Sequence, residues 1–479
     1  MKPVLSIAEM REVDKQALAH VSQDVLVERA GAAVANAAVR MLGGGYGRRI
    51  VVVAGAGNNG TDGRVAAAAL RRRGARVMVF EALSAPTRIG PPDTAEGIDL
   101  VIDAAYGTGF CGSYKAPEVP VGVPVLAVDI PSGVDGDTGE ACGEPLRADM
   151  TVTFAAFKPG LLQGDGPALA GNVVVADIGL DVSQAAINVI EDRDVVALLP
   201  DRAHDSHKWI GAVAVVAGSP GMLGAASLCT RGAYRAGAGM VRLVIPGASV
   251  DELPVSEAVT TAAPLDRWVP DALDSALRCR SLVVGPGLGR DPLTQEQVRV
   301  LLREVQVPTV VDADGLVALA AGPRSGDGTS ASGSLIALRG EDKNGAGTNR
   351  SVVLTPHDGE FEALAGVPPG SNRIASARAL AAVTGAVVLL KGPTTAVAAP
   401  DGRVLLALAG TPRLATAGTG DVLSGVIGAF IARGMPAFEA AGLAAHVHGR
   451  AASLGSREGL VAGDLAELVA VYLSEIRGG

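Results

Sequence analysis

The chain has 479 residues, of which 48% are hydrophobic and 19% are charged, a composition typical of folded globular proteins and not of disordered chains. At roughly 100–200 residues per domain, this length predicts two large domains. The formal net charge is −9 and the longest basic run is the three arginines 71–73, so no nucleic-acid or anionic-membrane surface is expected.

The four cysteines lie far apart and form neither a CxxC pair nor a cluster with histidine, so neither a zinc site nor a disulfide framework is expected. The first residues carry charges where a secretory signal needs an apolar core, and no uncharged apolar run is long enough to span a membrane. We therefore expect a cytoplasmic protein that binds small molecules rather than nucleic acid or membrane. We also expect a homo-oligomer.

The first half predicts two helices followed by alternating strands and helices. Apolar residues recur at helical spacing between residues 6 and 39, with a break near 21–24. A helix is predicted at 63–74, and continuous apolar strands begin at Arg49, Ala75, Leu100, Pro124, Met150 and Asn172. This alternation indicates a parallel, doubly wound α/β domain with a Rossmann-like three-layer αβα arrangement.

Residues 198–207 lose this periodicity and become polar, which predicts a boundary between a domain at 1–205 and a second domain at 206–479. The second domain is also predicted to be α/β, with helices beginning at Ala225 and Asp421. Its predicted strands begin at Ala212, Met240, Ser281, Thr309, Val352 and Ala386. Residues 322–350 are rich in Gly, Ser and charges, which predicts a flexible insertion.

A glycine-rich turn follows the first strand of the first domain. Gly55-Ala-Gly-Asn-Asn-Gly60 matches the GxGxxG pattern, and Glu81 ends the next strand, as in dinucleotide-binding oxidoreductases. However, Asn58, Asn59 and Asp62 add oxygen-bearing side chains where a pyrophosphate needs bare backbone N–H groups. These side chains suit a cation or a ribose better. The alternative that Asn and Gly only serve the turn geometry stays open.

Two further strands of this domain end in polar residues. Asp103 ends one of them, and Asp129 and Ser132 follow another. Because the carboxyl ends of parallel strands meet at one edge of a sheet, Asn59, Asp103 and Ser132 would supply oxygen atoms to one small site. Hard cations take oxygen ligands, so this set predicts a K⁺ site.

Five segments resemble the NAD(P)H-hydrate epimerase family over nearly all of residues 1–200. They are LVERAG (26–31), AGAGNNGTDG (54–63), VIDAAYGTG (101–109), VDIPSGVDGDTG (128–139) and VTFAAFKPGLL (152–162). The resemblance implies that Asp129 is the catalytic acid/base and that Asn59, Asp103 and Ser132 bind K⁺. It implies substrate contacts by Asp129 and by Asn58, Asn59, Gly60, Thr61, Asp62, Gly107, Thr108, Gly109, Phe110, Cys111, Gly112 and Ser113. Thr61 stands where the family usually has Gly.

In the second half, Gly418-Thr-Gly420-Asp421 precedes a strongly apolar helix. Backbone N–H groups and the positive end of the helix dipole would stabilise a phosphoryl group there, with Asp421 as a base beside the attacking hydroxyl. The alternative of an ordinary helix N-cap stays open. Lys391 to Thr395 follow a buried strand and offer a cation and hydroxyls to a nucleotide phosphate, and His357 lies at the end of another strand.

Seven segments over about 207–475 resemble the ADP- or ATP-dependent NAD(P)H-hydrate dehydratase family, which has a ribokinase-like αβα fold. They are HKWIGAVAVVAGSPGMLGAA (207–226), RAGAGMV (235–241), VVGPGLG (283–289), VDADGL (311–316), LTPHDGEF (354–361), KGPTT (391–395) and AGTGD (417–421). The resemblance implies that substrate touches Ala225, Gly287, Gly289, His357 and the catalytic Asp421. It implies nucleotide contacts by Lys391, Gly392, Pro393, Thr394, Thr395 and Gly420. Trp209 and Asp358 depart from the family's usual Gly and Pro.

Together the two resemblances imply one bifunctional repair enzyme for hydrated NADH and NADPH. It would interconvert the R and S hydrates and dehydrate the S form at the expense of ADP, giving AMP and phosphate, or of ATP. K⁺ is expected in the first domain, and Mg²⁺ with the nucleotide in the second. The alternatives are a ribokinase-like small-molecule kinase fused to a dinucleotide-binding domain, and a non-catalytic binding protein.

Overall fold

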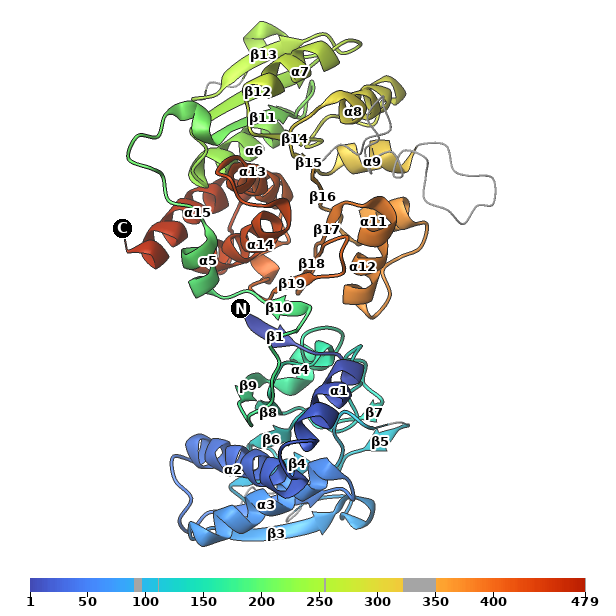
Figure 1. The fold of residues 1–479 in the computed structure, drawn as a ribbon, viewed down its shortest axis with the longest axis vertical. Helices are drawn as coiled ribbons and strands as arrows, with labels where there is room; N and C mark the ends of the chain where they lie inside the picture. The colour runs from blue at the N-terminus through green and yellow to red at the C-terminus, as the bar shows by residue number, and fades with distance from the viewer. Residues whose placement is uncertain (90–96, 111, 254–255, 322–349, 479) are drawn as a thin grey trace. The chain divides into compact units, whose positions relative to one another are not determined.

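The computed structural model describes residues 1–89, 97–110, 112–253, 256–321 and 350–478 (Figure 1). Cys111 and residues 322–349 of the predicted insertion lie outside the described residues. The chain divides into two compact units, Lys2–Ile187 and Asn188–Gly479, and Met1 belongs to the second. Each unit contains a largely parallel sheet with helices, which confirms the predicted α/β class. In the described part of the chain, no helix is long and apolar enough to cross a membrane.

The first unit has one six-stranded parallel sheet in the order β3-β2-β4-β6-β8-β9. Its sheet strands are β2 (Arg49–Ala54), β3 (Arg76–Glu81), β4 (Leu100–Ala104), β6 (Val125–Val128), β8 (Met150–Phe154) and β9 (Asn172–Ala176). The other elements are β1 (Lys2–Val4), α1 (Ile7–Leu18), α2 (Gln23–Leu42), α3 (Asn58–Arg72), β5 (Tyr114–Lys115), β7 (Gly143–Glu144) and α4 (Gly166–Ala170). All six predicted strands are present.

Both faces of this sheet are buried, which explains the continuous apolar runs of its strands. In β2, Ile50 and Val52 pack on the side of α2 and α3, whereas Val51 and Val53 point to the opposite side. Helix α3 begins at Asn58, five residues before the predicted start at 63. The polar residues 58–62 therefore lie in the first turns of a helix and not in a loop, because Gly57 in an extended conformation already caps the helix.

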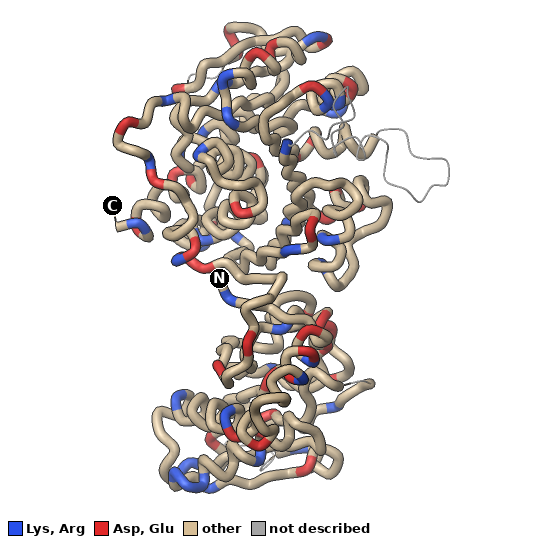
Figure 2. Tube along the Cα trace, viewed as in Figure 1, with Lys and Arg blue, Asp and Glu red and all other residues tan. Residues whose placement is uncertain are grey.

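The longest basic run, residues 71–73, ends α3 (Figure 2). Arg71 donates to the carbonyl oxygen of Val77 and Arg73 donates to Oδ1 of Asn36. Cations near a helix C-terminus also interact favourably with the helix dipole. These arginines thus stabilise the end of α3 within their own unit.

The sheet of the second unit includes, in order, β10-β19-β18-β17-β16-β15-β14-β11-β12-β13. Its strands are β10 (Ile187–Val189), β11 (Ala212–Val216), β12 (Met240–Pro246), β13 (Val259–Ala263), β14 (Ser281–Val284), β15 (Thr309–Val311), β16 (Val352–Leu354), β17 (Val387–Leu390), β18 (Thr395–Ala398) and β19 (Val404–Ala407). The pairs β17–β18 and β18–β19 are antiparallel, and the pairs from β13 to β17 are parallel. The strands β10, β13, β18 and β19 were not predicted from the sequence.

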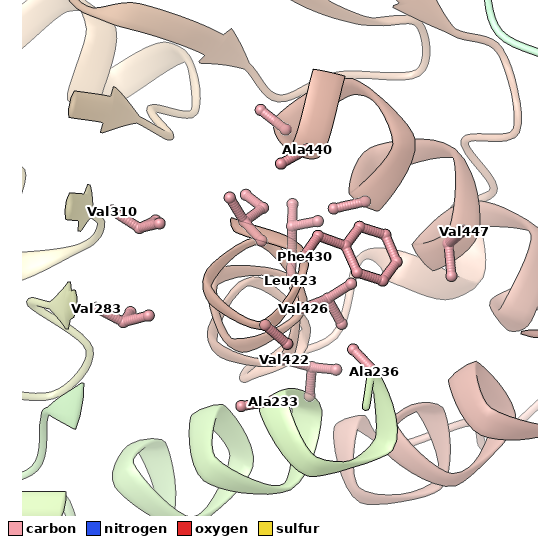
Figure 3. Packing of buried hydrophobic residues seen from close by; sticks show 14 of the residues in the cluster. Ala233, Ala236, Val283, Val310, Val422, Leu423, Val426, Phe430, Ala440 and Val447 are labelled. Atoms are coloured by element: carbon pink, nitrogen blue, oxygen red, sulfur yellow. The ribbon is translucent and has the colours of Figure 1, made fainter. Parts of the chain in front are cut away.

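The helices of this unit are α5 (Asp192–Leu198), α6 (Leu223–Arg235), α7 (Val269–Leu277), α8 (Pro292–Glu304), α9 (Asp314–Ala320), α11 (Asp358–Ala365), α12 (Arg373–Thr384), α13 (Thr419–Ala432), α14 (Ala437–Leu454) and α15 (Ala462–Arg477). Helix α13 is the centre of the core, and every residue from Val422 to Ala432 is buried. Figure 3 shows Phe430 of α13 surrounded by aliphatic side chains from neighbouring elements.

Two glycines allow α6 and α13 to approach each other closely. A Cβ on Gly232 would lie 2.4 Å from the carbonyl oxygen of Val422, and a Cβ on Gly425 would lie 2.0 Å from that of Cys229. Any side chain at either position would force the two helices apart. This contact fixes the position of the first turn of α13, where the predicted Asp421 lies.

The segment that follows residue 187 packs with the second unit. Asp192 of α5 accepts hydrogen bonds from Tyr472 of α15 and from Arg450 of α14, and its Oδ1 lies 2.8 Å from Nε2 of His446. The compact units therefore divide after Ile187, ahead of the boundary after residue 205 that the loss of periodicity predicted.

We expect Phe430→Ala to lower the free energy of unfolding of the second unit by about 3–5 kcal/mol, because it leaves a cavity beside α13. Both tryptophans of the chain, Trp209 and Trp268, lie in this unit, so their fluorescence during guanidinium unfolding reports on it alone. Leu277→Ala is the control, since Leu277 is 80% exposed, and it should change the stability by less than about 0.5 kcal/mol. Equal stabilities for the two variants would contradict the packing described.

Candidate active sites

The first unit contains a cavity of about 700 Å³ at the carboxyl ends of β2, β4 and β6. These strands are neighbours in the sheet, so the segments that follow them meet at one edge. Residues of α1, α2 and the start of α3 complete the lining. Seven of the predicted substrate contacts line it together with Asp129; the seven are Asn58, Asn59, Asp62, Gly107, Thr108, Gly109 and Phe110.

Other predicted contacts of this unit do not line the cavity. Gly60 is buried against the backbone of Gly55, where a Cβ would lie 1.9 Å from the carbonyl oxygen. Thr61 is exposed, and its hydroxyl donates to the carbonyl oxygen of Gly57. Gly112 and Ser113 are also absent from the lining. The first turn of α3 thus contributes Asn58, Asn59 and Asp62 to the cavity and uses the residues between them for packing.

Asp129 lies directly after β6 in a left-handed backbone conformation, with φ 66°. Its Oδ1 accepts a hydrogen bond from Nζ of Lys158 at 2.7 Å, and this ammonium also donates to Oγ1 of Thr153 and to the carbonyl oxygen of Phe154. Lys158 is only 2% exposed. The buried ammonium therefore fixes one oxygen of Asp129 and compensates its charge, while Asp129 still lines the cavity.

Lys158 was not among the site residues predicted from the sequence. The signal for it is a single cation in the text FAAFKPG, directly after the buried strand β8. A lysine among apolar residues that follow a buried strand needs an acidic partner, because an unpaired buried charge is strongly unfavourable. Asp129, 29 residues earlier, is that partner.

Asp62 and Asn59 lie one helical turn apart on α3, and both are buried. Burial, together with the charge of Asp129, raises the pKa of Asp62 to about 8. The side-chain amide of Asn59 has no hydrogen-bond partner among the described residues, although its oxygen and nitrogen are both inaccessible to solvent. An orphaned buried amide in a native site indicates a missing ligand.

The predicted cation ligands gather around the segment after β4. Ser132 donates to Asp103 through its backbone N–H at 2.9 Å and through Oγ at 2.6 Å, and its Oγ accepts from the backbone N–H of Tyr106. A Cβ on the next residue, Gly107, would lie 3.2 Å from Cγ of Asn59. Burial raises the pKa of Asp103. All three predicted ligands therefore border the loop 105–107.

Glu81, the acidic residue that would bind the ribose in a dinucleotide site, is paired with an arginine of this unit. Glu81, at the end of β3, forms an ion pair with Arg64, and Arg64 also donates to the carbonyl oxygen of Gly55. This pairing ties the first turns of α3 to the sheet. Glu81 thus has a partner within the protein, in place of the ribose hydroxyl that an oxidoreductase would offer it.

In the second unit, Gly418 adopts a left-handed conformation with φ 89° and caps the N-terminus of α13. The helix then begins with Thr419, Gly420 and Asp421. A Cβ on Gly420 would lie 3.5 Å from Nζ of Lys391, so the ammonium of this lysine lies beside the N-terminus of α13. Free N–H groups, the helix dipole and a lysine together make a site for an anion.

Lys391 is itself paired with a buried carboxylate that the sequence analysis did not identify. Its Nζ lies 2.7 Å from Oδ1 of Asp312, which is 1% exposed, and 3.8 Å from Oε2 of Glu360. Hydroxyls of Thr355 and Ser424 also donate to Asp312, at 2.7 and 2.6 Å. Burial alone would raise the pKa of Asp312, but Lys391 and the two hydroxyls lower it below its ordinary value.

Asp421 lies next to this cluster without a cation of its own. Burial raises the pKa of Asp421 to about 7, and the charge of Asp312 adds to this effect while Lys391 opposes it. A carboxyl group with a pKa near neutrality both accepts and releases a proton in the physiological range. The structure thus places a titratable carboxyl at the positive end of α13.

Two of the predicted substrate contacts, Ala225 and Gly287, are neighbours, since a Cβ on Gly287 would lie 2.8 Å from Cβ of Ala225. The backbone N–H of Gly289 donates to Asp314 at 2.9 Å. His357 caps α11, where its Nδ1 accepts from the backbone N–H groups of Gly359 and Glu360. Its Nε2 lies 3.5 Å from Oε1 of Glu360.

The predicted nucleotide segment 391–395 forms the connection between β17 and β18. Arg373 of α12 donates to the carbonyl oxygen of Lys391 and forms an ion pair with Asp358. Oγ1 of Thr395 donates to the carbonyl oxygen of Gly392. These contacts give the turn a fixed backbone beside the anion site of α13.

The residues that the structure describes contain no group of three or more His, Cys, Asp or Glu side chains suited to a metal ion. A cation in the first unit would therefore depend on Asn59, Ser132 and the backbone in addition to Asp103. Such oxygen sets suit hard cations.

Comparisons with known proteins agree with the division into two units. Residues 213–474 match the family model described as NAD(P)H-hydrate dehydratase, and residues 23–95 and 80–160 match the YjeF-related protein N-terminus. The bifunctional NAD(P)H-hydrate repair enzyme Nnr of Mycobacterium leprae is 38% identical, over 96% of this chain and 95% of its own. The protein of the same name from Moorella thermoacetica is 36% identical, over 99% and 97%.

The fold of the second unit is found in a ribokinase-like superfamily protein from Enterococcus faecalis. Its structure covers 61% of this chain and 98% of its own, with 20% identity and a TM-score of 0.51. This similarity confirms the predicted ribokinase-like fold.

His448 of α14 ties this helix to the start of α13, because its Nε2 lies 2.9 Å from the carbonyl oxygen of Thr419. Burial lowers the pKa of His448 to about 4. The unfolded chain therefore binds a proton near pH 6.5 that the folded unit does not, so stability falls as the pH drops. We expect a loss of about 2 kcal/mol between pH 7.5 and 5.

The measurement is guanidinium unfolding of the second unit, followed by tryptophan fluorescence at both pH values. In His448→Gln, the amide keeps a donor for Thr419 but does not titrate, so this share of the pH dependence should disappear. Identical pH slopes for the two proteins would contradict the assignment.

Proposed function

The chain belongs to the family of bifunctional NAD(P)H-hydrate repair enzymes, and on this basis we propose that Asp129 and Asp421 perform its two reactions. The substrates are NADH and NADPH that carry water across the C5–C6 double bond of the nicotinamide ring. The first unit interconverts the R and S hydrates, and the second dehydrates the S form. The similarity to the bifunctional relatives over nearly the whole chain is the observation that supports this function.

In the first unit, Asp129 accepts the proton of the C6 hydroxyl and returns it after the stereocentre has been lost. Its position in the cavity and the contact of Lys158 with Oδ1 support this role. Because Lys158 and Thr153 both donate to Oδ1, the second oxygen is left for the substrate. Lys158 acts as a positioning residue that holds the carboxylate in one orientation.

K⁺ is expected in the same unit, held by Asn59, Asp103 and Ser132. The orphaned amide of Asn59 and the all-oxygen character of the three side chains fit such an ion. When bound, it supplies a positive charge beside the loop that follows β4. Asn59 and Asp62 lie on one helix face, so this charge would act close to the substrate.

In the second unit, Asp421 takes the proton from the C6 hydroxyl of the S hydrate, and that oxygen receives the terminal phosphoryl group of ADP or ATP. Phosphate then leaves with the electron pair of the C6–O bond, C5 releases a proton to water, and the C5–H electron pair becomes the second bond of the C5–C6 double bond, which regenerates NAD(P)H. Backbone N–H groups from Gly418 to Asp421 stabilise the charge of the phosphoryl group in transfer. The pKa of Asp421, about 7, suits a base at neutral pH.

Lys391 to Thr395 and Gly420 hold the adenine nucleotide in this proposal, with Lys391 kept in place by Asp312. Mg²⁺ supplies positive charge to the nucleotide phosphates. The described residues contain no group of three or more acidic, His or Cys side chains suited to a metal ion, so we expect the nucleotide phosphates to provide most of the ligands of Mg²⁺. ADP as the physiological donor is part of the proposal.

We also propose a cytoplasmic location and a homo-oligomeric state. The described cysteines, Cys142, Cys229 and Cys279, are free thiols, which agrees with a reducing compartment.

Single substitutions should separate the two activities. The experiment follows the return of the near-ultraviolet absorbance of reduced nicotinamide from a mixture of R and S hydrated NADH, with ADP or ATP, Mg²⁺ and K⁺. Asp421→Asn should lose dehydration by at least about 10²-fold but still interconvert the isomers, which chromatography detects. Asp129→Asn should recover the S fraction and then stop.

Asn is chosen at position 129 because it tolerates the left-handed backbone, so the change tests the carboxylate and not the fold. In each variant, the activity of the unit without the substitution is the internal control for the amount of active protein. Loss of both activities in either variant, or no recovery by the unmodified chain with either nucleotide, would contradict the proposed function.

Asn59→Ala should weaken the K⁺ dependence of epimerisation, since it removes a ligand from the buried oxygen set. The rate is measured against K⁺ concentration, with choline keeping the ionic strength constant. Asn36→Ala, at an exposed position of α2 outside the cavity, is the control. An unchanged K⁺ response in Asn59→Ala would exclude this site for the cation.

A further inference from the structure

A second buried carboxyl group lies in the epimerase cavity beside Asp129. Asp62 is 8% exposed and lines the cavity of about 700 Å³. Its side chain forms no hydrogen bond or ion pair with the residues that the structure describes, and the nearby charge that acts on it is that of Asp129. Asp62 is therefore a buried polar group whose partner would be a ligand in the cavity.

The two carboxyl groups have different environments. Asp129 has the Lys158 ammonium and the Thr153 hydroxyl on one oxygen. Asp62 has no lysine or arginine partner among the described residues, so no side chain compensates its charged form and the neutral form is favoured, in agreement with its pKa of about 8. When two carboxyl groups in one site differ in this way, the compensated one is suited to act as the base and the other as the acid.

We propose that Asp62 is the proton donor of epimerisation, the acid that works with Asp129 as the base. This inference rests on the function proposed above. Asp129 takes the proton of the C6 hydroxyl, the O–H electron pair becomes the second bond of a C6 carbonyl, and the bond between C6 and the ring nitrogen breaks. The electron pair of that bond stays on the nitrogen, which receives the proton of Asp62.

The opened ring is an aldehyde with no stereocentre at C6. Rotation of this aldehyde presents the other face of C6 to the nitrogen. The nitrogen then attacks, its proton returns to Asp62, and the proton on Asp129 returns to the oxygen. Atoms, charges and electrons balance over the cycle, so the exchange of R and S needs no further reactant.

Other groups that line the cavity are less suited to this step. The pKa of Asp14 of α1 is also raised, by partial burial and by the charge of Asp129, while Lys158 lowers it. The residue as a whole is nevertheless exposed, so its carboxyl group exchanges its proton with water. Lys158 donates to three oxygens within the protein. Tyr106 packs its ring against that of Phe110, with 4.7 Å between the ring centroids.

The test compares Asp62→Asn with the unmodified chain, starting from the purified S hydrate without nucleotide and following the R form by chromatography. We expect the turnover rate of epimerisation to fall at least about 100-fold, with KM within a few-fold. Dehydration of the S form by the same molecules should be unchanged, because it takes place in the second unit, and the retained KM shows that the first unit still binds the substrate. Asp24→Asn, at an exposed position of α2 outside the cavity, should behave as the unmodified chain.

The pH profile of the unmodified chain is an independent measurement. Because Asp62 must carry its proton, the epimerisation rate should fall as the pH rises through about 8. Asp62→Glu keeps a carboxyl group and should restore part of the turnover and a descending limb. Absence of that limb in the unmodified chain would overturn the proposal even if Asp62→Asn failed to fold.

Three other results would also overturn it. The first is an unchanged turnover rate in Asp62→Asn, the second is a rise of KM alone, and the third is loss of turnover in Asp14→Asn but not in Asp62→Asn. In each of these cases the unmodified chain still epimerises, so the proposed function stands. If the unmodified chain does not epimerise, the proposed function and the role of Asp62 fall together.

Discussion

Removing a carboxylate from water is very unfavourable unless a cation and hydrogen-bond donors replace the lost hydration. Each unit of this protein meets this requirement with a lysine. Lys158 lies against Asp129 in the first unit, and Lys391 lies against Asp312 in the second. Both pairs lie at the ends of parallel strands, so both sites are built around a compensated charge in the edge region where such sheets bind ligands.

Each compensated pair acts on a second aspartate that has no cation of its own. The charge of Asp129 raises the pKa of Asp62, and that of Asp312 raises the pKa of Asp421, in addition to the effect of burial. The two sites then use the same arrangement differently. In the first, the paired aspartate lines the cavity and is the proposed base. In the second, the paired Asp312 is buried within the protein and the unpaired Asp421 is the proposed base.

Much of the fold follows from local patterns in the sequence, whereas the ion pairs do not. The central strands are continuous apolar runs, so they were predicted, whereas α3 begins five residues before the start that the sequence predicted. Lys158 and Asp312 were missed because their partners lie 29 and 79 residues away and no local periodicity connects them. The strands β13 (VTTAA) and β18 (TAVA) were missed because they consist largely of Thr and Ala and do not form the continuous aliphatic runs of the predicted strands.

The contacts of Asp192 have a consequence for how the two halves could be encoded. Strand β10 and helix α5 lie before residue 205 in the chain, yet Asp192 bonds to α14 and α15 near the C-terminus. A gene divided after residue 205, where the sequence loses its periodicity, would encode α5 together with the first unit and apart from α14 and α15, which it contacts. Two separately translated polypeptides would keep α5 together with α14 and α15 if the reading frame were divided close to codon 187.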